Sequence, residues 1–286
     1  MGRNYRAELT GVFGDPVDGN PTGVMEEAGY EALGLNYRYI TMKVTKDGFP
    51  DAMRAVRALN MRGVNLTMPL KITVLPWLDG LSRAAAIIGA VNTVVVREDG
   101  TLFGENTDGN GFVEALERAG ESAEGRHVAI LGAGGAARAI AIECALSGAA
   151  KVTVINRTLS RAEELAALIR EKTPAESTAL AWESGMAIPA DTDILINATP
   201  IGLAPDSNAL PEIDYSTVTD QMVVSDVVFN PPFTRFLEEA GKRGAKTVTG
   251  LGMLACQGAR NFTLWTGREA PLEVMENKLK EEFAEK

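Results

Sequence analysis

Three short polar clusters in the first part of the chain contain the side chains that could do chemistry. They occupy residues 65–71, 89–93 and 106–108, each at or just after the end of an expected strand, where open α/β sheets bind ligands. Their amides and hydroxyls can hydrogen-bond several hydroxyl groups of a polyol. Lys71 and Asp108 could move a proton while a hydride leaves the carbinol carbon. The clusters predict a polyol site; the alternative for Lys71 alone is a lysine on a helix surface.

A glycine-rich turn in the middle of the chain has the form of a dinucleotide-binding turn. It follows an apolar strand and opens a helix, and its pattern GxGxxA places Gly132, Gly134 and Ala137 at the key positions. Gly132 permits the tight turn, Gly134 lets a pyrophosphate approach the backbone, and Ala137 allows the helix to pack closely on the strand. The N–H groups of the helix start, at Gly135 and Ala136, would face the phosphates. The alternative is an ordinary glycine-rich turn.

The end of the next strand indicates which dinucleotide binds. Sites for NAD usually have Asp or Glu there, and this chain has Asn156, Arg157 and Thr158 instead. A guanidinium group suits the oxygens of a 2′-phosphate, and both Arg157 and Arg161 are placed to reach it. NADP is therefore predicted rather than NAD, unless both arginines are solvated surface charges.

The elements that position these residues alternate between strand and helix, which predicts an α/β protein with parallel sheets covered by helices. The expected strands are 9–13, 37–44, 63–67, 93–96, 127–131, 151–155, 194–196 and 222–225. The expected helices are 24–33, 49–59, 111–119, 135–146, 160–170, 251–264 and 272–285. We expect an N-terminal α/β substrate domain over residues 1–110, to which the helices from about 251 to 286 return. A doubly wound Rossmann domain for NADP is expected over residues 111–250.

The composition excludes several classes of function. The chain has 286 residues and a net charge of −10, which argues against a nucleic-acid partner. Two cysteines and one histidine argue against a Cys/His metal site, so no metal is expected. No apolar run is long enough to span a membrane, and no secretory signal is recognisable. The expected location is the cytoplasm.

The chain resembles the shikimate dehydrogenase family over nearly its whole length. The matching runs are NxTxPxK at 65–71, IGAVNT at 88–93, NTDGNGF at 106–112, GAGGAAR at 132–138, NRTLSR at 156–161, NATPIGL at 197–203, FNPPFT at 229–234 and GLGMLACQGA at 250–259. The resemblance implies an NADP-dependent oxidoreductase of aromatic amino acid biosynthesis. It would interconvert 3-dehydroshikimate and shikimate, or act on a related cyclic polyol.

The resemblance also implies roles for individual residues. Lys71 and Asp108 match the family's proton-transfer pair, and which of them is the formal base stays open. The residues matching those that bind substrate hydroxyls are Asn65, Thr67, Asn92 and Gln257. The residues matching positions at the cofactor, beyond the glycine turn and the two arginines, are Asn156, Thr158, Thr199, Gly250 and Met253.

The chain departs from the family where the substrate carboxylate is bound. The family's Ser-x-Ser-Pro becomes Asn20, Pro21, Thr22 and Gly23, and Phe229 replaces a tyrosine. Two of three expected carboxylate partners are thus changed, although Thr22 could still donate a hydrogen bond. We expect weak activity on shikimate and better activity on quinate, an amino-shikimate or a ring with no carboxylate. The alternative is drift, with an arginine or a water compensating.

Three other functions stay open at this point. A non-catalytic sensor of NADP and a ring metabolite would not need the Lys71 and Asp108 pair. A folate dehydrogenase would share the nucleotide fold but not the polar clusters of the first domain. A quinate dehydrogenase using NAD is disfavoured by Arg157 and Arg161. In each case the partner is a small molecule, and the chain would be a monomer or homodimer.

Overall fold

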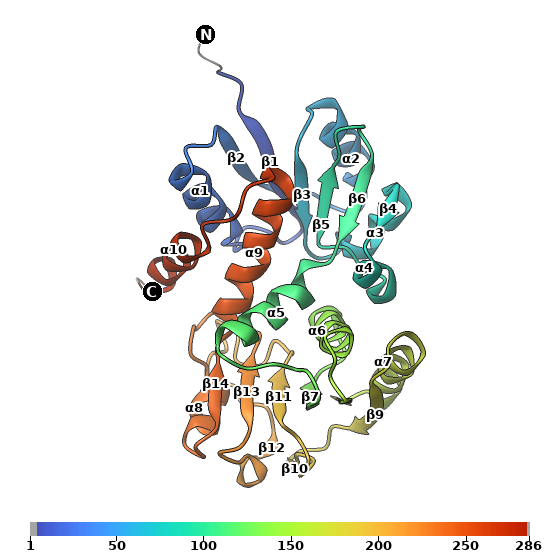
Figure 1. Cartoon of the computed structure of the whole chain (residues 1–286), viewed down its shortest axis with the longest axis vertical. Coiled ribbons are helices and arrows are strands. Elements are labelled where there is room, and N and C mark those ends of the chain that lie inside the picture. Colours follow the sequence, from blue (N-terminus) through green and yellow to red (C-terminus); the bar gives the residue numbers. More distant parts are fainter. Residues whose placement is uncertain (1–4, 285–286) are drawn as a thin grey trace. The chain divides into compact units, whose positions relative to one another are not determined.

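The chain forms two compact units. The computed structural model describes residues 5–284, so residue 285 of the last expected helix lies outside the described part. The first unit consists of Met1–Thr107 and Gln257–Lys286, and the second is Asp108–Cys256. Both boundaries fall within helices, one in α5 (Thr107–Arg118) and one in α9 (Gly250–Thr266) (Figure 1). The prediction placed them at residue 110 and at about residue 251.

The first unit is built on a six-stranded sheet with the order β2-β1-β3-β5-β6-β4. Its strands are β1 (Glu8–Gly14), β2 (Tyr37–Lys43), β3 (Gly63–Leu66), β4 (Gly80–Leu81), β5 (Thr93–Val96) and β6 (Leu102–Glu105). Strand β1 runs parallel to β2 and β3, whereas β5 is antiparallel to both β3 and β6. The sheet is therefore mixed, with parallel strands as expected and one antiparallel strand, β5. A turn with Gly100 at φ +81° joins β5 to β6, and so short a connection can link only antiparallel strands.

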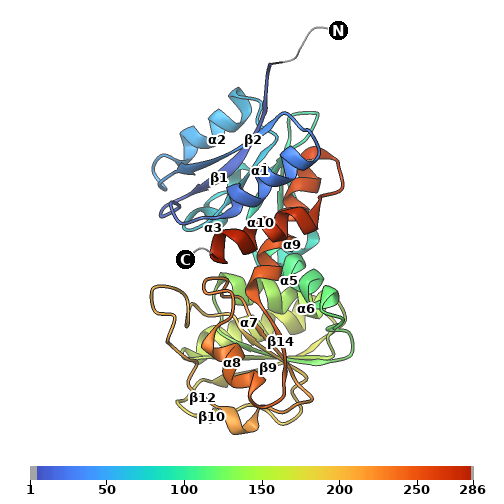
Figure 2. The same cartoon turned by 90° about the vertical axis from the view of Figure 1, so that its left-hand side faces the viewer.

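Helices cover both faces of this sheet. They are α1 (Thr22–Ala32), α2 (Phe49–Ala58), α3 (Leu70–Thr73), the 3-10 turn η1 (Leu75–Trp77), α4 (Arg83–Ile88), part of α9 and α10 (Leu272–Ala284). One apolar core joins Phe49 of α2 to Leu66 of β3 and Val94 of β5. On the other face α1, α9 and α10 lie side by side (Figure 2), where the rings of Tyr30 and Phe262 stack at 5.2 Å. The C-terminal helices are therefore part of the first unit's core.

The second unit is a Rossmann domain. All strands of its sheet are parallel, in the order β14-β13-β11-β7-β8-β9. They are β7 (His127–Leu131), β8 (Lys151–Asn156), β9 (Glu176–Ala181), β11 (Ile194–Asn197), β13 (Val223–Asp226) and β14 (Lys246–Val248). The helices are nearly all of α5, α6 (Gly135–Leu146), α7 (Leu159–Lys172), α8 (Arg235–Gly241) and the first part of α9. The unit also has a 3-10 turn η2 (Tyr215–Thr217) and a small pair of strands, β10 (Met186–Ala187) and β12 (Ile213–Asp214). The order follows the doubly wound pattern: from the first strand, β7, the next strands are added on one side (β8, β9) and the later ones on the other side (β11, β13, β14).

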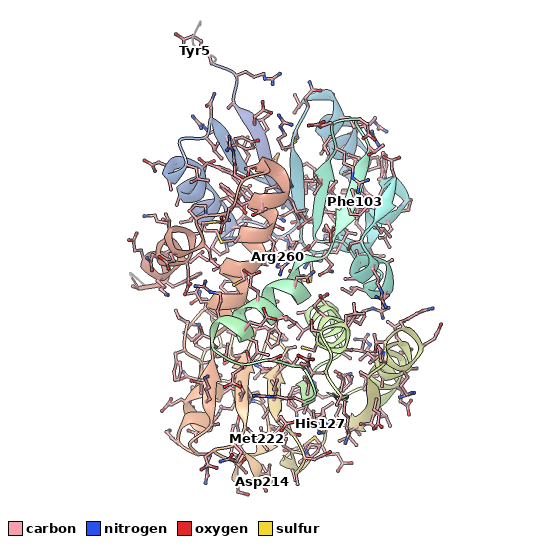
Figure 3. The ribbon with its side chains drawn as sticks, in the orientation of Figure 1. Tyr5, Phe103, His127, Asp214, Met222 and Arg260 are labelled. Carbon is pink, nitrogen blue, oxygen red and sulfur yellow. The ribbon has the colours of Figure 1, made fainter. Side chains whose placement is uncertain are left out.

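The carboxyl ends of these parallel strands all lie at the same end of the sheet, and the glycine turn follows β7 at that end. The chain's single histidine, His127, starts β7 at the opposite end (Figure 3). Its ring is buried between Thr153 Oγ1, at 2.8 Å from Nε2, and the carbonyl oxygen of Asp191, at 3.0 Å from Nδ1. The histidine thus joins strand and loop away from the cofactor end. Within the described part of the chain, no helix combines the length and apolar character that crossing a bilayer requires.

Candidate active site

A buried network of amide and hydroxyl groups lies under the predicted polyol site in the first unit. We call it the polar network; its members are Tyr39, Asn65, Asn92, Thr93, Thr107, Gln257 and Asn261, all buried. The Tyr39 hydroxyl donates to Asn65 Oδ1 at 2.8 Å, and Asn65 Nδ2 donates to Thr93 Oγ1 at 3.0 Å. Thr93 Oγ1 in turn donates to Asn261 Oδ1 at 2.7 Å. Strands β2, β3 and β5 and helix α9 are therefore held together by polar side chains.

Asn92 connects the predicted catalytic elements to this network. Its Oδ1 accepts a hydrogen bond from the backbone N–H of Thr107 at 2.8 Å. Thr107 begins α5, and Asp108 is the next residue. One residue before Asn92, the N–H of Val91 donates to the carbonyl oxygen of Lys71 at 2.9 Å, which ties α3 to the same loop. Lys71 and Asp108 are both half-buried. The loop that contains Asn92 bonds to the backbone of Lys71 and to that of Thr107, the residue before Asp108.

Two members of the polar network lie outside every residue set that the sequence indicated: Tyr39 and Asn261. Asn261 is fully buried on α9, and its Nδ2 donates to Gln257 Oε1 one turn earlier at 3.3 Å. A spacing of four residues on one helix was the signal available, because such side chains are neighbours. Asn65, predicted to bind substrate, has both ends of its amide engaged with protein groups.

The loop at residues 20–23, predicted to bind the substrate, has one side-chain oxygen bonded to its own backbone. Asn20 Oδ1 accepts a hydrogen bond from the N–H of Thr22 at 3.0 Å, at the start of α1. Burial raises the pKa of the Tyr39 hydroxyl well above its usual range, and a hydrogen bond from the Thr22 side chain lowers it only in part. Thr67 is half-buried against Gly14, and Phe229 is a half-buried residue of the second unit.

The glycine turn of the second unit has room for a phosphate group. Gly132 has φ +109°, and a Cβ atom there would lie 3.1 Å from both the Ala198 carbonyl oxygen and Thr199 Cγ2. Around Gly134 and Gly135, by contrast, a Cβ atom would meet nothing within 4 Å. No side chain caps the start of α6, so its first N–H groups can bind an anion.

The end of β8 presents two cations. Arg157 and Arg161 are both exposed, and Asn156 Nδ2 donates to the carbonyl oxygen of Thr158 at 2.9 Å, which shapes the turn between them. Arg157 also lines a pocket with Trp182 and Ile201. Trp182 lies just after β9, a strand that the sequence analysis did not predict. The arrangement suits a nucleotide with an additional phosphate on the ribose.

Asp226 explains why two of the sequence runs occur together. Its carboxylate accepts hydrogen bonds from Asn197 Nδ2 at 3.0 Å, from the Val228 N–H at 3.0 Å and from Thr234 Oγ1 at 2.7 Å. Burial raises the pKa of Asp226 to about 6, and these hydrogen bonds lower it only in part. The runs NATPIGL and FNPPFT are thus joined through one carboxyl group at the carboxyl edge of the sheet.

Gly250 and Met253, predicted to lie beside the nicotinamide, are in the first turn of α9. A Cβ atom at Gly250 would lie 2.4 Å from the carbonyl oxygen of Val228, so this glycine allows the helix to begin against the end of β13. Met253 is half-buried. Among residues 5–284 there is no group of three or more His, Cys, Asp or Glu side chains that could hold a metal ion.

Three family models match successive parts of the chain, and their descriptions agree. The model of the shikimate dehydrogenase substrate binding domain matches residues 12–94, that of shikimate / quinate 5-dehydrogenase matches 114–203, and that of the shikimate 5'-dehydrogenase C-terminal domain matches 250–280. A shikimate dehydrogenase (NADP(+)) of Desulforamulus reducens is 42% identical over 284 residues, 98% of this chain and 97% of the relative.

Two solved structures have the same fold. The ligand-free 5-ketofructose reductase of Gluconobacter sp. strain CHM43 gives a TM-score of 0.94 at 47% identity, covering 98% of this chain and all of that one. The shikimate 5-dehydrogenase of Thermus thermophilus, in complex with NADP(H) and shikimate, gives 0.83 at 37% identity, covering 96% and 99%. The fold class expected from the sequence is confirmed.

Proposed function

The chain belongs to the shikimate dehydrogenase family of NADP-dependent dehydrogenases, and from this premise we propose that its substrate is a polyol or ketose without a carboxylate. The reaction transfers a hydride between the nicotinamide and a carbinol or ketone carbon, and a proton to or from the oxygen of that carbon. The structure called 5-ketofructose reductase suggests the kind of substrate, a sugar with two ketone groups and no acid.

The observation that supports this substrate class is the engagement of the Asn20 loop with the protein itself. Asn20 Oδ1 accepts from the N–H of Thr22, and the Thr22 side chain is buried near the Tyr39 hydroxyl. Phe229 has no polar side-chain atom. A carboxylate loses about 1.5–3 kcal/mol for each charged hydrogen bond that a site fails to provide. Loss of two would reduce turnover of shikimate by orders of magnitude, whereas a substrate without the acid loses nothing.

The proton-transfer roles are proposed for Lys71 and Asp108. Lys71 would hydrogen-bond the reacting oxygen, and Asp108 would take part in the proton transfer as its partner. Bound NADPH supplies the hydride from C4 of its nicotinamide. The N–H groups after Gly134 and the guanidinium groups of Arg157 and Arg161 would hold its phosphates.

Initial-rate absorbance at the NADPH band tests the proposal. The panel is 5-ketofructose, 3-dehydroshikimate and the oxidised forms of quinate and an inositol with NADPH, and shikimate, quinate and inositols with NADP and NAD. We expect 5-ketofructose or another acid-free substrate with NADP(H) to give the highest kcat/KM. If shikimate with NADP reaches the ordinary enzyme range, about 10⁴ M⁻¹s⁻¹ or more, the proposal of an acid-free substrate is wrong.

The proposal also includes a cytoplasmic location and a monomer or homodimer. Cell fractionation with an antibody tests the first, and light scattering coupled to gel filtration tests the second. A sensor without activity would instead bind NADP and ligand tightly and turn over nothing in the panel.

A further inference from the structure

Glu26 is a fully buried carboxyl group in the first unit, and its oxygens make no hydrogen bond of good geometry with the described residues. It lies on α1 with 0% of its surface exposed, and neither carboxyl oxygen has a partner among residues 5–284. Buried polar groups are nearly always hydrogen-bonded, because leaving one unpaired destabilises the fold. A buried acid that satisfies nothing within the protein suggests a partner that arrives with a ligand.

The surroundings of Glu26 connect it with the predicted substrate residues. Thr22 lies four residues earlier on α1, so the two side chains are neighbours on the buried face of the helix. On the facing helix, a Cβ atom at Gly258 would lie 3.6 Å from Glu26 Oε1, and Gly258 follows Gln257. Tyr39, which bonds to Asn65, has its pKa raised by burial first and by its proximity to Glu26 second. Thr22 on the same helix and the turn of α9 at Gly258 thus lie beside Glu26, and Tyr39 is within its electrostatic reach.

The protonation state of Glu26 fits a neutral partner. Burial raises the pKa of its carboxyl group well above the usual range, and the charge of Glu27 raises it further. The Tyr30 hydroxyl lowers it in part, although that hydroxyl is engaged with Thr10 Oγ1 at 2.9 Å. A neutral carboxyl group has one donor and one acceptor, and a hydroxyl group can satisfy both. A carboxylate offers acceptors only, and two adjacent acids cannot both ionise.

We propose that Glu26 determines substrate specificity: its carboxyl group hydrogen-bonds a substrate hydroxyl at the end of the site where a carboxylate would otherwise bind. The inference rests on the proposed function, because it assigns the residue that recognises an acid-free polyol or ketose. Glu26 exchanges no atoms or electrons with the substrate. It selects the substrate through the hydrogen bonds that it can form. In the ligand-free protein the unpaired carboxyl group lowers the free energy of unfolding.

The test compares Glu26→Leu and Glu26→Gln with the wild type, and Glu31→Gln, an exposed acid on the same helix, is the matched control. For each protein, kcat/KM is measured for 5-ketofructose with NADPH and for shikimate with NADP, together with the melting temperature. We expect E26L to lower kcat/KM for 5-ketofructose by roughly 10- to 100-fold while melting at or above the wild-type temperature. E26Q keeps a donor and an acceptor, so it should retain most ketose activity and gain on shikimate. E31Q should behave as wild type.

The ratio of the two kcat/KM values decides the inference. A ratio that falls in both Glu26 variants supports it whichever substrate the wild type prefers. An unchanged ratio overturns it, as does a drop in melting temperature with equal losses on both substrates, which would indicate a structural role. The proposed function fails separately, when the wild type itself prefers shikimate. If E26L does not fold, the isosteric E26Q ratio gives the decision.

Discussion

At the scale of single residues, Lys71 and Asp108 are the side chains on which turnover should depend most. Replacing Lys71 with Met, or Asp108 with Asn, should lower kcat roughly 10²- to 10⁴-fold, because positioned proton transfer contributes about that much. The double variant should lose little more than the worse single one, since the two act as a unit. Stopped-flow and steady-state rates with NADPH measure this, and Lys46→Met, an exposed lysine, is the control. Full activity in either single variant would remove that residue from the mechanism.

Cofactor choice is expected to depend on Arg157 and Arg161. Replacing both with Ala removes the two positive charges that we propose bind the 2′-phosphate, so KM for NADP should rise roughly 10- to 100-fold while KM for NAD changes little. Saturation kinetics with each cofactor measure the two constants. Lys172→Ala, on the same helix, controls for the general loss of positive charge. Equal effects on both cofactors would show that the arginines do not bind the 2′-phosphate.

Which site residues the sequence could reveal depended on whether they belong to a local pattern. The glycine turn and the arginines directly follow two successive strands, β7 and β8, so their spacing alone suggested a dinucleotide site. Tyr39 and Asn261 are separated by more than 200 residues and meet only through the fold, and Glu26 reads locally as one of several acids on a helix. Glu26 stands out only because it is buried, and its burial results from the packing of helix α1 against α9.

At the scale of elements, Asp226 should make stability depend on pH. Its pKa rises from 3.8 to about 6 on folding, so the folded state favours the protonated form. The resulting stabilisation is complete below pH 3.8 and is lost as pH rises through about 6, amounting to roughly 3 kcal/mol. Asp226→Asn should therefore be more stable than the wild type above pH 6 and show a weaker pH dependence.

Urea unfolding between pH 4 and 7 measures the Asp226 effect. Asp206→Asn, an exposed acid in the same unit, is the matched control and should follow the wild-type curve. The same pH slope in Asp226→Asn and in the wild type would mean that Asp226 stays ionised in the folded protein.

The elements that the sequence predicted well are those with strong local signals. Strands 93–96 and 127–131 and helix 135–146 have the predicted bounds, because an apolar run ends there at a glycine or turn sequence. The missed elements are short, such as β4, or lack apolar periodicity, such as the mostly exposed β9. Edge strands of this kind form because a neighbouring strand offers hydrogen bonds, and this information is absent from the local sequence.

At the scale of the whole molecule, cofactor binding should stabilise the chain selectively. A ligand that binds only the folded state at 100 times its Kd adds about 2.7 kcal/mol. NADP should therefore raise the melting temperature by several degrees, and NAD at the same concentration by less. Differential scanning calorimetry with each cofactor measures the shift. The Arg157/Arg161 double alanine variant should abolish the difference between NADP and NAD, and an equal shift with both cofactors in the wild type would contradict the assignment.

The division of the chain has a consequence for its synthesis on the ribosome. The second unit is inserted between Thr107 and Gln257, so the first unit's sheet is complete long before the helices that cover one face of it. At 5–20 residues per second, translation of the intervening segment takes roughly 7–30 s. During this interval Tyr30 and Thr93 await Phe262 and Asn261, their partners from α9. The nascent substrate unit should therefore be the part that a chaperone protects, while the Rossmann unit can fold as it emerges.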